Sequence, residues 1–112
     1  MAGRYRALLI GIATYPLDEH NLAPLKGPHN DTAAVRRALT DNDTGLFDDI
    51  DVATLADVDS PDALRGMSRF YAVADRHDVL LLYYSGHGKL DLSGRLHLCM
   101  HDTDTSDCSR PQ

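Results

Sequence analysis

The stretch Val79-Leu-Leu-Leu-Tyr-Tyr-Ser-Gly-His-Gly88 carries six apolar or aromatic residues directly into a histidine between two glycines. A continuous apolar run is typical of a parallel strand that is covered on both faces, whereas a strand with one solvated face alternates. The glycines beside His87 allow a sharp turn and the close approach of a ligand to the imidazole. Open α/β sheets bind ligands beyond the carboxyl ends of their strands. We therefore predict a buried strand over 79–84 that delivers His87 to a binding site.

Four segments that precede this strand alternate between strand and helix. The expected elements are a strand at 7–12, a helix from Asn30 or Asp31 as N-cap to about Leu39, a strand at 52–55, and a helix that starts at Ser60-Pro61-Asp62. This order indicates an α/β fold with a mainly parallel sheet and right-handed crossovers. We expect the strand order second, first, third, which forms a crevice between the carboxyl ends of the first and third strands.

Helical spacing predicts which face of each helix is buried. On the first helix, Val35, Ala38 and Leu39 share the buried face and Arg36 and Arg37 point outward. On the second helix, the core stripe consists of Leu64, Met67, Tyr71 and Ala74. Beyond Gly88, two short segments around Ser93-Gly94 predict a hairpin, and the tail 101–112 is polar and expected to be irregular.

Length, charge and cysteine content limit the function classes. The 112 residues suit one small domain, and the net charge of −6 without a basic stripe argues against a nucleic-acid partner but is compatible with basic peptides. The longest apolar run is far shorter than a membrane span, and the start lacks the pattern of a signal peptide. Two cysteines do not make a secreted disulfide framework, so we expect a reducing cytoplasm. Nine arginines against two lysines are associated with a bacterial source.

The residue His87 is the leading candidate for acid-base chemistry, because the pKa of a histidine lies close to neutrality. The alternatives are a turn histidine with only a structural hydrogen bond, and a phosphate loop at 85–90, which lacks the required glycine spacing. A histidine base needs a nucleophile within hydrogen-bond reach. Bulky residues flank Cys99, which is expected to be a core thiol, and Cys108 lies in the polar tail, so we expect neither to be the nucleophile.

A zinc site is the other chemistry to weigh, because alternate residues of a strand share a face. The possible ligands are His97, Cys99, His101 and Asp102. They lack a second ligand pair at a usual spacing, so we expect no metal and no cofactor. Asp31 also has two interpretations. Its carboxylate either complements the dipole of the first helix, or lies in the crevice and pairs with a cationic substrate side chain, and the topology allows both.

Three segments resemble the caspase-like cysteine peptidases, and within them the paracaspase and metacaspase branch. They are Arg6-Ala-Leu-Leu-Ile-Gly-Ile12, Leu25-Lys-Gly-Pro-His-Asn-Asp-Thr-Ala-Ala-Val35 and Leu82-Tyr-Tyr-Ser-Gly-His-Gly88, and the segment 98–104 is similar to a family segment that ends in an aspartate. The resemblance implies a three-layer caspase-like fold. It also implies that His87 is the general base and acid of a Cys/His dyad, that the Gly88 amide is an oxyanion-hole donor, and that Asp31 is an acid of the S1 pocket. Such an acid implies cleavage of a protein or peptide substrate after Arg or Lys.

The resemblance leaves the nucleophile to be found elsewhere. In this family the cysteine follows the histidine by about 50 residues, and 25 residues follow His87 here. We therefore expect residues 1–104 to be the N-terminal, large-subunit-like part of a peptidase domain, and 105–112 to be a polar tail or processing loop. The expected partner is a C-terminal portion that adds strands beside the apolar 79–84 strand and supplies the cysteine, without which the chain is inactive. The alternative is a noncatalytic pseudo-peptidase module that binds a partner through the same crevice or sheet edge.

Overall fold

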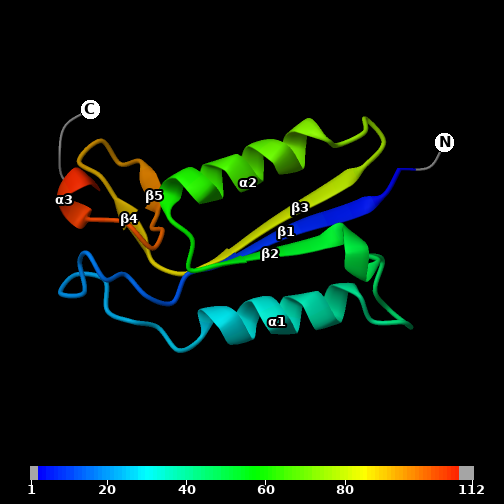
Figure 1. The fold of residues 1–112 in the computed structure, drawn as a ribbon, viewed down its shortest axis with the longest axis horizontal. Helices are drawn as coiled ribbons and strands as arrows, with labels where there is room; N and C mark the ends of the chain where they lie inside the picture. The colour runs from blue at the N-terminus through cyan, green and yellow to red at the C-terminus, as the bar shows by residue number, and fades with distance from the viewer. Residues whose placement is uncertain (1–2, 109–112) are drawn as a thin grey trace.

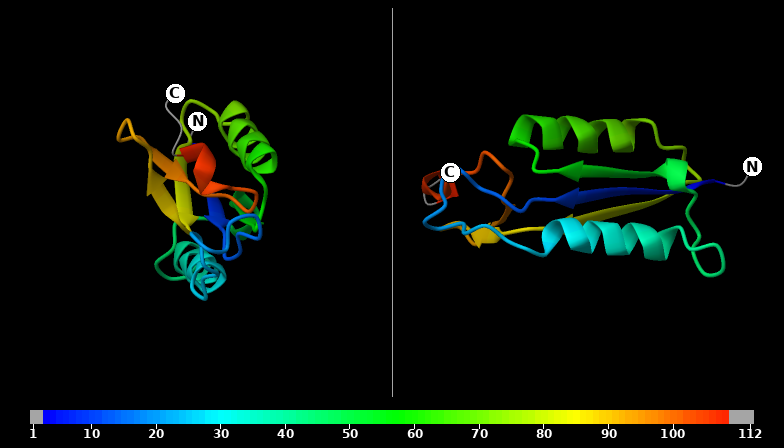
Figure 2. Two further views of the ribbon diagram at one scale, coloured as in Figure 1. Left: turned by 90° about the vertical axis from the view of Figure 1, so that its left-hand side faces the viewer. Right: turned by 60° about the horizontal axis from the view of Figure 1, so that its bottom comes forward.

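A parallel sheet lies between two helices. The computed structural model describes residues 3–108, in which the elements are β1 (Tyr5–Gly11), α1 (Pro28–Leu39), the short 3-10 helix η1 (Asp49–Asp51), β2 (Val52–Ala56), α2 (Ser60–Ala72), β3 (Val79–Ser85), β4 (Gly88–Leu90), β5 (Leu96–Leu98) and α3 (Thr105–Cys108). The sheet order is β2-β1-β3, and α1 and α2 lie on opposite faces (Figure 1 and Figure 2). The predicted α/β class and strand order are confirmed. Over these residues, no helix has both the length and the apolar character needed to cross a membrane.

The three parallel strands end together at one edge of the sheet. Gly11, at the end of β1, is aligned with Ala56 of β2 and with Ser85 of β3. Chains that leave parallel strands emerge on the same side, which is where α/β sheets place their ligands. The β4–β5 hairpin, α3 and the loop after β1 all gather at this end of the molecule (Figure 1).

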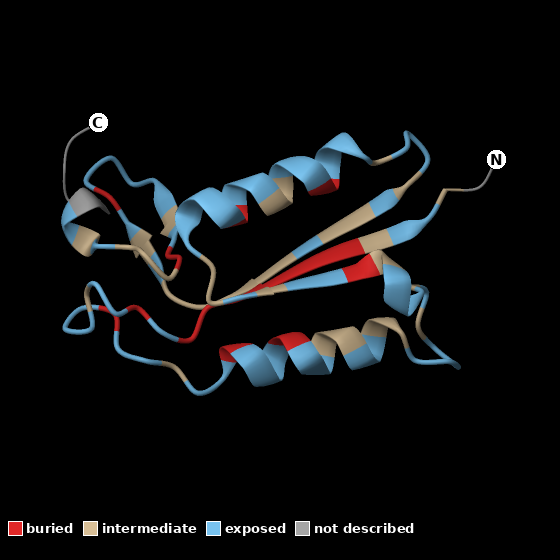
Figure 3. Ribbon diagram, in the orientation of Figure 1, coloured by how far each residue is buried: buried red, intermediate tan, exposed pale blue. Residues whose placement is uncertain are grey.

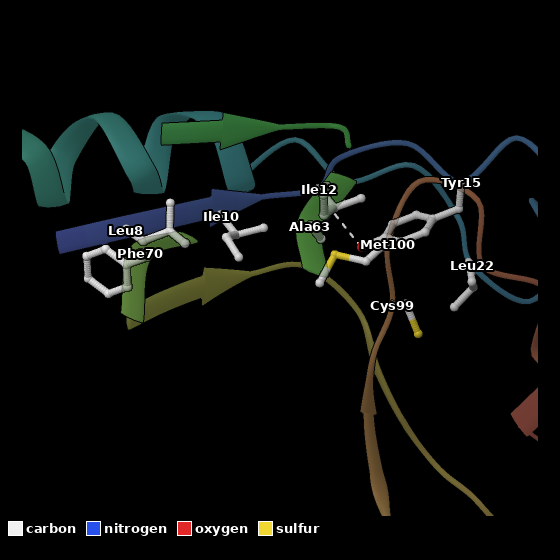
Figure 4. Packing of buried hydrophobic residues seen from close by; sticks show 9 residues of the cluster. All are labelled: Leu8, Ile10, Ile12, Tyr15, Leu22, Ala63, Phe70, Cys99 and Met100. Atoms are coloured by element: carbon white, nitrogen blue, oxygen red, sulfur yellow. Dashed lines mark hydrogen bonds between the residues drawn. The ribbon is translucent and has the colours of Figure 1, made fainter. Parts of the chain in front are cut away.

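The central strand β1 supplies the core on both faces. Leu8 and Ile10 point toward α2, where they join a cluster with Phe70, whereas Ala7 and Leu9 point toward α1. The five residues of β1 from Ala7 to Gly11 are buried (Figure 3). Figure 4 shows how the cluster on the α2 face continues past the strand end through Ile12 and Tyr15. Burial on both faces explains why β1 is apolar at consecutive positions.

Strand β3 is less covered than its sequence predicts. It pairs with β1 along its whole length, and in residues 3–108 it forms the edge of the three-stranded sheet. Val79 is 50% exposed and Leu82 is 39% exposed. The expectation of a strand buried on both faces is therefore wrong for β3 in this structure, because an edge position leaves part of the strand without neighbours.

Helix α1 begins earlier than predicted, and one of its two arginines points toward the sheet. Gly27 occupies the cap position and Pro28 opens the helix, because proline has no N–H to lose and its φ suits the first turn. Asn30 and Asp31 are therefore not caps, and Asp31 lies in the first turn. The partly buried Arg36 does not point outward: its guanidinium donates to the carbonyl of Val52 at 2.6 Å. Of the predicted buried face, Val35 and Leu39 pack against the core, and Ala38 is exposed.

Helix α2 buries a stripe adjacent to the predicted one. The residues that face the core are Ala63, Met67 and Phe70, and the exposed ones include Leu64 and Tyr71. Asp59, and not Ser60, occupies the N-cap position of the helix, without a side-chain cap hydrogen bond. The amide and hydroxyl of Ser60 both donate to Asp102 at 2.8 Å and so join the helix start to the segment after β5. Burial acts to raise the pKa of Asp102, but the hydroxyl and amide of Ser60 outweigh it and lower the pKa.

The hairpin after β3 is confirmed, and the tail differs from the prediction. Strands β4 and β5 pair antiparallel around Ser93-Gly94, where Gly94 has a φ of 81°. Asp91 closes the turn by accepting the amide of Arg95, and it also pairs with His97. The prediction of an irregular tail is wrong for the residues that form the short helix α3. The start of this helix is held by Asp18, which accepts both the amide and the hydroxyl of Thr105. The end of the predicted tail, 109–112, lies outside the described residues.

Candidate active site

The predicted crevice corresponds to the region at the end of the sheet where the chain leaves β1 and β3, and we use the word for that region. The amide of Ile12 donates to the carbonyl of Ser85 at 2.9 Å, so the two strands stay paired up to the point at which the chain turns away. Beyond it, the loop 12–27 lies on one side and residues 86–88 on the other. The ring of Tyr15 lies 5.0 Å from the imidazole of His87, between centroids, at an angle of 57°. The structure thus places His87 at the strand end, as the sequence predicts.

The imidazole of His87 is held by a backbone carbonyl of the loop. Its Nε2 lies 2.8 Å from the carbonyl oxygen of Ala23. A carbonyl only accepts, so Nε2 carries the proton and Nδ1 is left with its lone pair as the basic nitrogen. A base whose second nitrogen is fixed by an acceptor is the arrangement that acid-base catalysis requires.

The role of Ala23 is not visible in the sequence, because any residue offers a carbonyl. The one local signal is Pro24, which disfavours helical backbone at the residue before it and so keeps Ala23 extended. The loop is anchored on both sides of this residue. Leu22 is buried, and the amide of Leu25 donates to the carbonyl of Ala13 at 2.8 Å. These contacts give the Ala23 carbonyl a fixed position opposite His87.

The carboxylate of Asp31 reaches the end of β3 from the first turn of α1. The hydroxyl of Ser85 donates to Asp31 Oδ2 at 2.8 Å. Asp31 is exposed, and Ser85 is separated from His87 by only one residue. The structure therefore brings Asp31 to the crevice while it also occupies the helix N-terminus, so the two interpretations of this acid are compatible in geometry.

Gly88 begins β4 in an orientation that leaves its amide outside the hairpin ladder. The amide of Cys99 donates to the carbonyl of His87 at 2.9 Å, and Gly88 is aligned with Leu98. Hydrogen-bonded and non-hydrogen-bonded pairs alternate along antiparallel strands. Gly88 and Leu98 therefore form a non-hydrogen-bonded pair, in which the Gly88 N–H points away from β5.

The described cysteine is a core residue. Cys99 is completely buried in the cluster on the α2 face, beside Met100 (Figure 4). Its Sγ lies 3.9 Å from the carbonyl oxygen of His97, and its amide donates to the carbonyl of His87. The prediction of a core thiol is confirmed. The side chain of Cys108 lies outside the described part of the structure.

The possible zinc ligands are engaged separately. His97 Nε2 lies 2.8 Å from Asp91 Oδ2, and His101 Nδ1 lies 3.2 Å from the hydroxyl of Thr14. The His97 hydrogen bond is the main cause of the lowered pKa of Asp91. Within residues 3–108, the structure brings together no group of three or more His, Cys, Asp or Glu side chains that could hold a metal ion.

Asp57, directly after β2, is a structural centre of the crevice that the sequence reasoning missed. It adopts a φ of 49°, and its Oδ1 accepts the amides of Ala13 at 2.7 Å and of Thr14 at 3.2 Å. Its Oδ2 lies 3.0 Å from His29 Nε2 at the start of α1. Burial acts to raise the pKa of Asp57, but the two amides and the nearby histidines outweigh it and lower the pKa. An acid directly after a strand is the only sequence signal for this role.

Of three comparisons with known proteins, the one with protein-family models finds a match. No curated protein and no solved structure matches the chain. The family model of the caspase domain, peptidase family C14, matches residues 4–109, which include all three strands of the sheet and the histidine at its end. Caspase-domain proteins are cysteine peptidases in type, which agrees with a basic imidazole nitrogen at the crevice. The chain belongs to the caspase domain family.

Proposed function

We propose that this chain forms the histidine-bearing portion of a cysteine endopeptidase that cleaves after Arg or Lys. The observation that carries the proposal is the bond from His87 Nε2 to the carbonyl of Ala23, which leaves Nδ1 basic and fixed at the crevice. Cys99 is buried in the core cluster, where a peptide substrate has no access to its thiol, so we do not assign it as the nucleophile. The nucleophilic thiol then comes from a C-terminal portion of the same peptidase, which adds its strand at the edge of β3.

In the proposed reaction, His87 accepts a proton and then donates it in each of two stages, formation and hydrolysis of the thioester. Nδ1 takes the proton of the incoming thiol, and the thiolate attacks the scissile carbonyl carbon. The oxyanion that forms accepts the N–H of Gly88, which points away from the hairpin. Nδ1–H then protonates the leaving amine as the C–N bond breaks. A water that loses a proton to the same nitrogen attacks the thioester carbon, the C–S bond breaks, and Nδ1–H returns the proton to the departing sulfur. While the imidazole is charged, the Ala23 carbonyl stabilises it through Nε2–H.

The preference for a basic residue rests on Asp31. The Ser85 hydroxyl occupies one lone pair of Oδ2, and the carboxylate keeps acceptor positions for an arginine or lysine side chain. An acid at this position and the Tyr-Ser-Gly-His-Gly run favour the paracaspase and metacaspase branch. A thiol nucleophile also favours a reducing compartment such as the cytoplasm. The division into a peptidase part at 1–104 and a processing loop at 105–112 stays a prediction.

Peptide cleavage by the complete protein tests this proposal. Peptides that differ only in arginine, lysine or aspartate before the scissile bond are offered to the wild type, to His87→Ala, and to the matched control His77→Ala, which changes an exposed histidine. We expect cleavage after arginine and lysine, a loss of about a thousandfold in His87→Ala, and no change in the control. Cleavage after aspartate would overturn the assignment of Asp31.

The second candidate function is a pseudo-peptidase module that binds a partner at the crevice or along β3. The exposed edge of β3, where Val79 and Leu82 are partly uncovered, is the observation in its favour. Equal, residual cleavage by wild type and His87→Ala, together with retained peptide binding, would support this function and contradict the first.

A further inference from the structure

The hydroxyls of two tyrosines beside His87 hold its backbone in place. A catalytic imidazole has to be held in one place, yet His87 lies between two glycines, the residues with the greatest backbone freedom. The peptide groups on either side of the His87 Cα are each held by hydrogen bonds. We refer to the hydroxyls of Tyr15 and Tyr84, which lie 3.3 Å apart and contact both peptide groups, as the tyrosine brace.

On the N-terminal side, Tyr15 holds the amide of His87. The N–H of His87 donates to Tyr15 Oη at 2.8 Å, and Tyr15 in turn donates to the carbonyl of Ile12 at 3.1 Å, a bond drawn in Figure 4. Tyr15 is completely buried. The chain of donors links the His87 backbone to the end of β1, which is fixed in the centre of the sheet.

On the C-terminal side, Tyr84 holds the carbonyl of His87. The single proton of Tyr84 Oη is shared between the carbonyl oxygens of His87 at 2.8 Å and of Cys99 at 2.5 Å, and the His87 carbonyl also accepts the amide of Cys99 at 2.9 Å. The carbonyl of His87 and the N–H of Gly88 belong to one planar trans peptide, so they point in opposite directions. Fixing this carbonyl therefore also fixes the direction of the Gly88 N–H, the proposed oxyanion donor.

The glycine at position 86 is explained by the same two hydroxyls. A Cβ on Gly86 would lie 2.4 Å from Tyr84 Oη and 2.6 Å from Tyr15 Oη, closer than atoms can approach. The brace thus occupies the space in which any other side chain would stand. Burial raises the pKa of Tyr15 and that of Tyr84, so both hydroxyls stay neutral in the range where a histidine titrates.

We infer that Tyr15 and Tyr84 are positioning residues, whose hydroxyls orient the His87 imidazole and the Gly88 N–H by holding the two peptide groups between them. This inference rests on the proposed role of His87. The predicted consequence is specific to catalysis: loss of one hydroxyl lowers kcat and leaves KM nearly unchanged, because the hydroxyls hold the His87 peptide groups, whereas Asp31 is held by Ser85.

The test substitutes phenylalanine for each tyrosine in the complete protein. The matched control is Tyr71→Phe, which removes the hydroxyl of a half-exposed tyrosine on α2. We expect kcat for an arginine peptide to fall between about 10-fold and 100-fold in Tyr15→Phe and in Tyr84→Phe, with KM within twofold of wild type. The control is expected to match wild type.

Nuclear magnetic resonance of histidine labelled with ¹⁵N supplies a readout that does not depend on cleavage. In the wild type we expect the ring of His87 to be a single tautomer protonated at Nε2, and in Tyr15→Phe we expect averaged tautomers and an upfield shift of the His87 amide proton. Unchanged ring signals in both variants would overturn the inference, even if activity fell. If the wild type cleaves no peptide, the proposed function fails, and the ring signals still decide whether the brace positions His87. If Tyr15→Phe does not fold, Tyr84→Phe decides the test alone.

Discussion

Strands β1 and β3 are each seven residues long, lie side by side and are both apolar, yet the structure uses them differently. Residues Ala7–Gly11 of β1 are buried between the two helices, whereas in β3 Val79 and Leu82 stay partly exposed. The candidate site lies at the end of the less buried strand, because Ser85 is its last residue and His87 follows two residues later. The comparison suggests a division of roles in which the buried side chains of β1 stabilise the fold and β3 positions the candidate site residues at its end. Substitutions in each strand can test this division.

The largest effect is expected in the core of β1. Leu9 is completely buried, and Leu9→Ala is expected to lower the free energy of unfolding by about 3 kcal/mol, since it removes buried methyl groups and leaves a cavity. The paired change Leu82→Ala in β3 is expected to cost less than about 1 kcal/mol, because Leu82 is 39% exposed. Chemical denaturation of both variants measures the difference. Equal losses would mean that the edge of β3 is covered in the protein as it exists.

A smaller effect is expected where β3 ends. Gly86→Ala places a methyl group against two tyrosine hydroxyls and is expected to cost about 2 kcal/mol. Gly88→Ala is the matched change, since its nearest new contact is Leu96 Cδ1 at 3.3 Å, the end of a flexible side chain, and it is expected to be nearly neutral in stability. Thermal unfolding compares the two. A Gly86→Ala protein as stable as Gly88→Ala would show that the hydroxyls can move apart.

Low pH is expected to weaken the hydrogen bonds that hold the segment after β1 before it weakens those of the tyrosine hydroxyls after β3. The pKa of Asp57 is lowered in the folded state, so its stabilisation is complete above the unfolded value of about 3.9 and is lost as the pH falls through the lower, folded value. Asp57→Asn is expected to reduce the free energy of unfolding by about 1 kcal/mol at neutral pH and to flatten its slope below pH 4. Burial raises the pKa values of Tyr15 and Tyr84, which hold the backbone after β3, so their hydroxyls stay neutral over this range of pH. Unfolding curves from pH 2 to 7 measure the slope, and an unaltered slope in Asp57→Asn would assign it to other acids.

The smallest effect is expected at Ser85. Its hydroxyl fixes one oxygen of Asp31, so Ser85→Ala is expected to raise KM for an arginine peptide about threefold and to leave kcat unchanged. Ser106→Ala, in the exposed part of α3, is a control for the loss of a hydroxyl. Steady-state kinetics measures both. A fall in kcat without a change in KM would place Ser85 with the base and not with the substrate.

The sheet could be predicted from the sequence because each strand is a continuous apolar run and the crossovers have only one favourable hand. The buried face of α2 could not be predicted, since Leu64 and Tyr71 fit a stripe as well as Ala63 and Phe70 do, and only the packing against β1 distinguishes them. The difference is that local patterns locate the strands and a general rule of handedness limits their order, whereas the rotation of a helix depends on its particular contacts with residues distant in sequence.

The same distinction applies to the candidate site. His87, Gly88 and Asp31 could be proposed from local motifs, and their roles stay predictions. Ala23 could not be proposed, because it acts through a carbonyl that every residue has. The hydrogen bonds of Tyr15 and Asp57 could not be predicted, because the amides of His87 and Ala13 that they accept lie 72 and 44 residues away along the chain, so no short spacing relates them.

The β2-β1-β3 order also determines when the site can form. Leu8 pairs with Ala53 and Leu82, which follow it by 45 and 74 residues, so β1 is synthesised first and waits for both of its neighbours. Closing such long loops is slow compared with forming a helix. During synthesis, the apolar central strand is unpaired until residue 56 has left the ribosome, and the histidine gains its support only after residue 85. The order of the strands thus makes the end of the sheet the last part of this fold to be assembled.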